Sequence, residues 1–299
     1  MLQLTDAGTI RSLLERHGFH FSKAMGQNFL CAGWVPSRIA ECAGADRKTG
    51  VLEIGPGIGC LTAELSRRAG RVVSVELDRR LLPILAETLA DCRNVKIVPG
   101  DIMALELPAL MDFALSGFER RIVCANLPYQ ITTPVLSLLL RSGCFESLTV
   151  MLQREVAERI CAKENTPEYG AFSILVQWYA VPERLFDVPP SCFLPAPKVT
   201  SSVLRLNLRK EPPVAVSDPE LFFALVRAAF QQRRKTLCNA MVHGLGLKKE
   251  DAVSALESCG LSPMIRGEAL SIAQFALLSE HLKAEIGAGV AGLPEQERR

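Results

Sequence analysis

The chain has 299 residues, of which 48% are hydrophobic and 22% charged, and its formal net charge is +2. This balance fits a globular protein with one large and one smaller domain, and it excludes a uniformly basic protein. The ten cysteines include no C-x-x-C pair and no paired Cys/His spacing, which argues against a disulfide framework or a metal site and favours the reducing cytoplasm. Because no apolar run resembles a signal peptide or is long enough to cross a bilayer, we expect no membrane association.

The N-terminal residues predict a helix followed by an irregular segment. Apolar positions at helical spacing indicate a helix over 6–17, with Thr5 as a candidate N-cap. The segment 23–30 mixes a cation, amides and a large aromatic. It is either a plain loop or a flap over a bound ligand, in which Asn28 forms a hydrogen bond and Leu30 packs.

A glycine-rich turn follows the first predicted strand. Residues 51–54 are apolar enough for a strand, Gly55-Pro56-Gly57-Ile58-Gly59 follows at once, and 61–69 has a helical pattern. A strand, a glycine turn and a helix form the unit that lets the backbone approach a nucleotide closely. Cys60 occupies the place of a third fingerprint glycine, so the loop favours a donor without a pyrophosphate. On its own such a loop is a weak signal.

Two acidic residues follow the next two predicted strands. Glu76 follows the strand 71–75, and a carboxylate there can accept the ribose hydroxyls of an adenosine. After a helix at 79–89, the strand 95–98 leads to Asp101, placed to accept from an adenine amino group, with Ile102 against the ring. Either acid alone could be a solvated carboxylate at a strand end. Two of them after a glycine loop favour a nucleoside site.

A fourth strand, 121–125, leads into Asn126-Leu127-Pro128-Tyr129. Pro128 would end strand pairing, which places the tetrapeptide in a loop at the edge of the sheet where ligands bind. The Asn126 side-chain oxygen and the Leu127 carbonyl could accept from an adenine N6 and direct its lone pair at a methyl donor, while Tyr129 stacks on a flipped base. The alternative is an ordinary strand exit with a buried tyrosine.

The middle of the chain completes the sheet. Helices are expected at 132–141 and 154–162, a strand at 148–152, and a core-facing aromatic stripe at 172–179. Two closing strands, 184–188 and 201–206, flank a stiff proline-rich loop. That loop holds Phe193 either over a site or in the core, and the sequence leaves both interpretations open.

Beyond a linker at 210–213 the pattern is helical and basic. Residues 205–249 contain nine Lys/Arg against three Asp/Glu. Contact with phosphates is therefore a fair hypothesis, although such a run is often only a solvated surface. The helices are expected at 219–231, 235–243, 249–258 and 268–286, and the candidate RNA-binding residues are Arg227, Arg233, Arg234, Lys235, Lys248 and Lys249.

Taken together, these motifs resemble those of the rRNA adenine N6-dimethyltransferases, and most closely the small-subunit branch of that family. The similarity runs from about residue 11 to about 285. Met25 stands where the family has Phe, and Cys31-Ala32 replaces a more polar pair. The residues that carry the resemblance are Gly26 to Leu30, Glu53 to Gly59, Glu76, Gly100-Asp101, Asn126 to Tyr129, and Phe193 to Val199.

The resemblance implies an α/β fold, a Rossmann-like S-adenosylmethionine (SAM) methyltransferase sheet with helices on both faces, plus a small all-α C-terminal domain. It also implies a catalytic domain over 1–209, in which residues 1–30 form the N-terminal helix and flap. A helical RNA-binding domain would follow over 210–286, and a disordered tail over 287–299. By motif position the donor would contact Asn28, Leu30, Gly55, Gly57, Glu76, Leu77, Asp101, Ile102 and Asn126. The target amine would lie against Asn126, Leu127, Pro128 and Tyr129, with Phe193 holding the flipped adenine.

The implied reaction is dimethylation of two adjacent adenines in the 3′-terminal hairpin loop of small-subunit rRNA. It would take place in an immature ribosomal particle, with SAM as cofactor, no metal, and the enzyme a monomer. Three other functions stay open. The target could be large-subunit rRNA or DNA adenine, the protein could act mainly as an assembly factor, or the glycine loop could serve a nicotinamide oxidoreductase.

Overall fold

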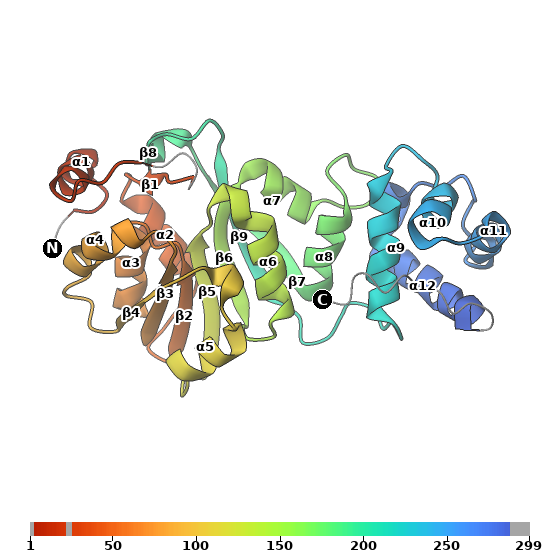
Figure 1. Ribbon diagram of the computed structural model, residues 1–299, viewed down its shortest axis with the longest axis horizontal. Coiled ribbons are helices and arrows are strands. Elements are labelled where there is room, and N and C mark those ends of the chain that lie inside the picture. The colour runs from red at the N-terminus through yellow and green to blue at the C-terminus, as the bar shows by residue number, and fades with distance from the viewer. Residues whose placement is uncertain (1–2, 22–25, 288–299) are drawn as a thin grey trace. The chain divides into compact units, whose positions relative to one another are not determined.

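The computed structural model describes residues 3–21 and 26–287, with side chains through residue 284 (Figure 1). The chain forms two compact units. One runs through Ala157 and includes Ala180–Leu208, and the other combines Glu158–Tyr179 with the residues from Arg209 on. The sequence-based boundary at 209 assigned Glu158–Tyr179 to the first domain. This segment groups with the C-terminal helices because its side chains belong to their hydrophobic core.

The first unit is built on a mixed seven-stranded sheet. Five neighbouring strands are parallel, and β9 pairs antiparallel with both β6 and β7. Chain order reverses between β2 and β5, which makes that gap the topological switch point of the sheet. In spatial order the strands are β4 Val95–Pro99, β3 Arg71–Glu76, β2 Thr49–Ile54, β5 Arg120–Asn126, β6 Ser147–Gln153, β9 Ser201–Leu208 and β7 Ala180–Val188.

The central strands are covered on both faces. All six residues of β2 are buried, and so are Ile122 to Ala125 of β5, although neighbouring residues of a strand point to opposite faces. Val51 packs with α2 and α3 in one hydrophobic cluster. Because both faces of these strands are covered, their sequences do not alternate between apolar and polar residues. The expected α/β arrangement is confirmed. The helices of this unit are α1 Ala7–Arg16, α2 Trp34–Cys42, α3 Cys60–Arg68, α4 Leu82–Thr88, α5 Leu107–Ala114 and α6 Thr132–Arg141.

Local details of this unit differ from the sequence expectations. Asp6, not Thr5, caps α1, since its carboxylate accepts from the Thr9 N–H at 2.7 Å. The helices α2 and α5 were not expected. A two-stranded antiparallel sheet, also unexpected, pairs β1 Phe29–Leu30 with β8 Phe193–Leu194. It ties the expected flap to the proline-rich loop.

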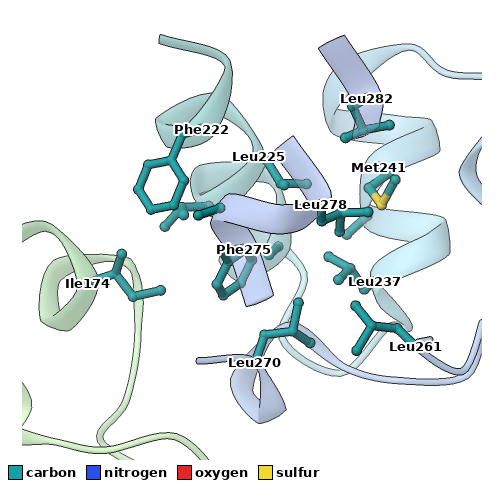
Figure 2. Packing of buried hydrophobic residues seen from close by; sticks show 14 of the residues in the cluster. Ile174, Phe222, Leu225, Leu237, Met241, Leu261, Leu270, Phe275, Leu278 and Leu282 are labelled. Carbon is teal, nitrogen blue, oxygen red and sulfur yellow. The ribbon is translucent and has the colours of Figure 1, made fainter. Parts of the chain in front are cut away.

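The second unit is helical, with one hydrophobic core (Figure 2). Phe222 and Phe275 are fully buried there, and Trp178 packs on Phe222 with ring centroids 4.3 Å apart. Burying a side chain of this size contributes about 1.5–3 kcal/mol. The expected aromatic stripe is helix α8. The helices are the end of α7 Arg154–Cys161, then α8 Ala171–Tyr179, α9 Pro219–Gln231, α10 Leu237–Leu245, α11 Lys249–Ser258 and α12 Ile272–Gly287.

Two helix starts in this unit lie later than the sequence predicts. The helix α10 begins at Leu237 because Thr236 caps it by accepting from the Asn239 N–H. The cluster Arg233 to Lys235 therefore precedes the helix and does not begin it. The helix α12 starts at Ile272, after a short 3₁₀ turn at Gly267–Ala269. Apart from Gly287, the expected tail at 287–299 lies outside the described residues.

Candidate active site

A pocket of about 310 Å³ opens at the carboxyl ends of the parallel strands of the first unit. Its walls include the loops after β2 and β5, the two strands on either side of the switch point, where open α/β sheets bind ligands. Every residue that the sequence assigns to the donor or to the target amine lines this pocket. These residues are Asn28, Leu30, Gly55, Gly57, Glu76, Leu77, Asp101, Ile102, Asn126, Leu127, Pro128, Tyr129 and Phe193.

The glycine turn forms the floor of the pocket in a conformation that side chains disfavour. Gly55 and Gly57 have φ angles of 66° and 60°. A Cβ at Gly57 would lie 3.2 Å from the Phe29 ring, and one at Gly55 would lie 3.7 Å from Pro128. The turn therefore presents bare backbone to the pocket while it packs against the flap and the 126–129 loop.

Glu76 is a buried carboxylate at the end of β3. It accepts from the Asp78 N–H at 2.7 Å and is 5% exposed. Burial raises its pKa to about 7. Hydrogen bonds from the backbone N–H groups of Asp78 and Gly57 favour the charged form and act in the opposite direction, but burial is the larger effect. Asp78 in turn is held by Arg80, which lowers the Asp78 pKa, and by the Gln27 amide at 2.8 Å. A polar network thus fixes the carboxylate that the sequence assigns to ribose.

The end of β4 supplies one exposed acid and apolar surface. Asp101 is exposed, and its carboxylate accepts from the Met103 N–H at 2.9 Å. Ile102 is buried, whereas Leu77 is 52% exposed although it lines the pocket. Together with Leu77, which follows β3, the loop after β4 thus adds two apolar side chains and one carboxylate acceptor to the pocket lining.

The 126–129 loop leaves two oxygens uncommitted. The Leu127 N–H is bound to the Met151 carbonyl at 3.0 Å, which ties the loop to β6. The Pro128 carbonyl accepts from Ile131 and Thr132. Among the described residues, neither the Asn126 carboxamide nor the Leu127 carbonyl has a hydrogen-bond partner. These are the two acceptors assigned to an exocyclic amine.

The two aromatic residues of the site are held in different ways. Tyr129 is half-buried, and its hydroxyl lies 2.7 Å from the Ser201 hydroxyl. Burial raises the Tyr129 pKa, so the phenol stays neutral. Phe193 is 4% exposed, belongs to a core cluster and also lines the pocket. The structure thus combines the two interpretations left open for it.

Sequence reasoning missed several residues that line the pocket, among them Glu53, Gln27 and Gln130. Glu53 is 1% exposed and accepts from Thr62 and Ser74 at 2.7 and 2.6 Å. Burial raises its pKa to about 7. A charged residue inside the apolar run 51–54 was the available signal. Of the expected flap, Lys23, Ala24 and Met25 lie outside the described residues.

The six candidate RNA-binding residues belong to the second unit, and all are exposed. Arg233 also has a structural role. It donates to the backbone carbonyls of Pro167 and Tyr169 at 2.7 and 3.0 Å and lies 3.5 Å from the Glu268 carboxylate. Arg234 and Lys235 form no ion pair within the described part of the chain.

The chemistry of the pocket fits SAM. Its floor is bare backbone, its side walls are apolar, and a fixed buried acid lies at the strand end assigned to ribose. No group of three or more His, Cys, Asp or Glu residues within 3–21 and 26–287 is arranged to hold a metal ion. None of the helices in those ranges is long and apolar enough to span a bilayer.

Comparison with known proteins gives one consistent result. The family model described as ribosomal RNA adenine dimethylase matches residues 18–283. "Ribosomal RNA small subunit methyltransferase A" of Geobacillus thermodenitrificans is 46% identical over 283 residues, which cover 93% of this chain and 97% of the relative. The protein of the same name from Streptococcus pneumoniae is 45% identical over 289 residues, covering 95% and 99%.

Solved structures agree on the fold. The 23S rRNA methyltransferase ErmE superposes with a TM-score of 0.65 at 28% identity, covering 86% of this chain and all of that one. A dimethyladenosine transferase from Plasmodium falciparum superposes with a TM-score of 0.71 at 22% identity, covering 87% and 97%. The Rossmann-like methyltransferase expectation is thereby confirmed. With its pocket, its glycine turn and a family match over most of its length, the chain belongs to the ribosomal RNA adenine dimethylase family and is a SAM-dependent methyltransferase.

Proposed function

We propose that this chain dimethylates N6 of two adjacent adenosines in the 3′-terminal hairpin loop of small-subunit (16S) rRNA, using the 126–129 loop as its target-amine site. The observation that carries the residue assignment is the pair of uncommitted acceptors, the Asn126 carboxamide and the Leu127 carbonyl, on a loop anchored to β6. Both oxygens belong to one short loop that lines the pocket.

The chemistry required of the protein is polarisation and orientation. The lone pair of adenine N6 is delocalised into the ring, so the amine is a poor nucleophile. Two acceptors that take its N–H bonds pull the nitrogen toward tetrahedral geometry, an effect that grows in the transition state. When bound, SAM supplies an electrophilic methyl group on a sulfonium. The methylated ammonium is acidic enough to lose its proton to water, so the site needs no strong base.

Several side chains hold the purine and the donor in register. Tyr129 stacks on the flipped base, and Phe193 closes the apolar side of the pocket. Glu76 accepts the ribose hydroxyls of the donor, with Asp101 and Ile102 at its adenine. Asn28 and Leu30 cover the donor from the flap. Holding both reactants in one geometry supplies much of the rate.

Small-subunit rRNA is the target that the relatives favour. The relatives named for the small subunit are 44–46% identical over more than nine-tenths of the chain, against 28% for the 23S enzyme ErmE. We place the reaction in the cytoplasm, on an immature ribosomal particle and with the enzyme a monomer. In this role the exposed cations Arg227, Arg234, Lys235, Lys248 and Lys249, together with Arg233, contact rRNA phosphates.

An assembly function without catalysis is the second candidate, supported by the exposed basic residues of the helical unit. Asn126→Ala separates the two functions, because it removes one acceptor from the pocket and leaves the helical unit untouched. We expect single-turnover methyl transfer to fall by roughly 10²–10³-fold while particle binding persists. Asn207→Ala, an exposed carboxamide near the far end of β9, is the matched control and keeps full activity. Wild-type methylation by the Asn126 variant would refute the proposed role of the loop.

A further inference from the structure

The Tyr129 hydroxyl makes its hydrogen bond to Ser201, a residue 72 positions away in the chain. The two oxygens lie 2.7 Å apart, and either can donate. Tyr129 lines the pocket, whereas Ser201 lies behind it and does not. The bond therefore joins the target-amine loop to a strand that contributes no surface to the cavity.

Ser201 is a rigid anchor. Its side chain is fully buried, and it is the first residue of β9. Its backbone pairs with Gln153 of β6 on one side and with Val188 of β7 on the other. Because β9 runs antiparallel to β6, its first residue lies at the edge of the sheet where the parallel strands end. The central antiparallel strand thus places one fixed hydroxyl at the level of the 126–129 loop.

The tyrosine needs such an anchor because its own segment is weakly held. Tyr129 starts a single 3₁₀ turn, Tyr129–Ile131, in which no residue is fully buried, and Gln130 next to it is exposed. Within the described residues the ring makes no contact with another aromatic ring. The hydroxyl pair is the polar contact that fixes how far the ring is swung about its Cα–Cβ bond, because rotation about that bond moves the hydroxyl oxygen away from Ser201.

We propose that Ser201 is a positioning residue for methyl transfer: it holds the Tyr129 ring at the angle that presents the flipped adenine to Asn126. This inference rests on the proposed function, in which Tyr129 stacks on the base. Turning the ring moves a purine stacked on it, and with the purine its N6, relative to the two acceptors. Ser201 acts through Tyr129 and touches neither the base nor the donor.

The strand supplies a matched control in the next residue. Ser202 is as buried as Ser201, but its side chain points to the opposite face of the sheet and donates to the Asp187 carboxylate at 2.6 Å. Ser202→Ala removes the same atom from the same strand, together with one part-buried hydrogen bond. It leaves the contact with Tyr129 in place.

The test is a double-mutant cycle on single-turnover methyl transfer to unmethylated small-subunit particles at saturating SAM. We expect Ser201→Ala and Tyr129→Phe each to transfer methyl groups about tenfold more slowly than the wild type. Each variant loses the one hydrogen bond that holds the ring on which the target base stacks. The double variant should be no slower than either single one, Ser202→Ala should match the wild type, and SAM affinity should be unchanged in all four. The inference would be overturned if the fold-decrease in rate of the double variant equalled the product of the two single decreases, or if Ser201→Ala reacted at the wild-type rate.

Two variants of Tyr129 keep the outcome interpretable. If Ser201→Ala folds poorly, Tyr129→Phe removes the same bond from the pocket side, and its wild-type rate would overturn the inference alone. Tyr129→Ala tests the underlying function. A slow Tyr129→Ala beside a normal Ser201→Ala rejects only the positioning role, whereas a normal Tyr129→Ala rejects the stacking role and with it this inference.

Discussion

Two buried carboxylates, Glu53 and Glu76, lie at the pocket, and burial raises the pKa of each to about 7. An ordinary glutamate has a pKa near 4.5, so near neutral pH these two residues hold protons that exposed carboxylates have released. Glu53 has neutral hydrogen-bond partners, Thr62 and Ser74, and among the described residues no cation shifts its pKa. Both the stability of the protein and its affinity for ligand should therefore change with pH as these two carboxyl groups titrate.

Glu53→Gln tests the stability effect, because the amide oxygen can accept the same two hydroxyl bonds without a charge. The raised pKa of Glu53 contributes stability that is complete below about pH 4.5 and is lost as the pH rises to about 7. We expect the wild type to lose about 3 kcal/mol relative to the Gln variant over this window. Melting temperatures measured across this pH window give the difference. The control is Glu183→Gln, on the exposed surface of β7, whose curve of melting temperature against pH should be parallel to that of the wild type. Parallel curves for the Glu53 variant would contradict the assigned pKa.

Glu76 predicts a pH dependence of donor binding. The ribose hydroxyls donate, so the pocket binds best when Glu76 is ionised, and below about pH 7 it has to release a proton first. The SAM dissociation constant should rise as the pH falls below 7, by up to roughly tenfold per pH unit. Calorimetry in two buffers would detect the released proton. In Glu76→Gln the affinity should be lower and independent of pH, while Glu41→Gln on the exposed side of α2 should retain the wild-type profile.

At the scale of the element, the turn after β2 depends on backbone that only glycine adopts easily. Gly57→Ala forces a Cβ toward the Phe29 ring at a φ of 60°, and we expect SAM affinity to fall at least about tenfold. Gly117→Ala is the control for strain alone, because Gly117 has a φ of 83° and a Cβ added there would meet no atom within 4 Å. Both variants should lose about 1–2 kcal/mol of stability. Equal SAM affinities in the two would show that the turn does not shape the donor site.

The basic segment before α10 divides into a structural and a free part. Arg233 holds the carbonyls of Pro167 and Tyr169, whereas Arg234 and Lys235 are exposed. Reversing Arg234 and Lys235 to Glu should weaken rRNA binding and reduce its salt slope by about one unit per lost phosphate contact, without lowering the melting temperature. Arg233→Glu should lower the melting temperature. Unaltered rRNA affinity after the double reversal would remove these two residues from the interface.

The sequence predicted those elements whose signal is local. Buried strands were visible as apolar runs, and several pocket residues were visible because they follow such a run directly, as Glu76 and Asn126 do. The pairing of Phe29–Leu30 with Phe193–Leu194 was not predictable, because strands of two residues have no period and the paired residues are 165 and 163 positions apart. The Tyr129–Ser201 bond escaped for the same reason.

At the scale of the whole molecule, the division into two units was predicted, but its boundary was not. The segment Glu158–Tyr179 precedes two strands of the sheet in sequence, and chain order alone assigns it to the first domain. Its helical stripe is compatible with either core. Only three-dimensional packing shows that Ile174 and Trp178 share a cluster with Phe222 and Phe275. Figure 2 shows Ile174 beside these two phenylalanines.

The two units also divide the proposed work, since the pocket residues all belong to the first and the six candidate RNA-binding cations all belong to the second. Catalysis and particle binding should therefore be separable by mutation. A variant in the 126–129 loop should compete with the wild type for particles without modifying them.

The most direct test of the account is mass spectrometry of the 3′-terminal hairpin of 16S rRNA after incubation of unmethylated small-subunit particles with SAM and the protein. The wild type should convert two adjacent adenosines to N6,N6-dimethyladenosine, and Asn126→Ala should leave both unmodified although it binds the particles. Methylation at another site, or equal modification by the Asn126 variant, would contradict the account.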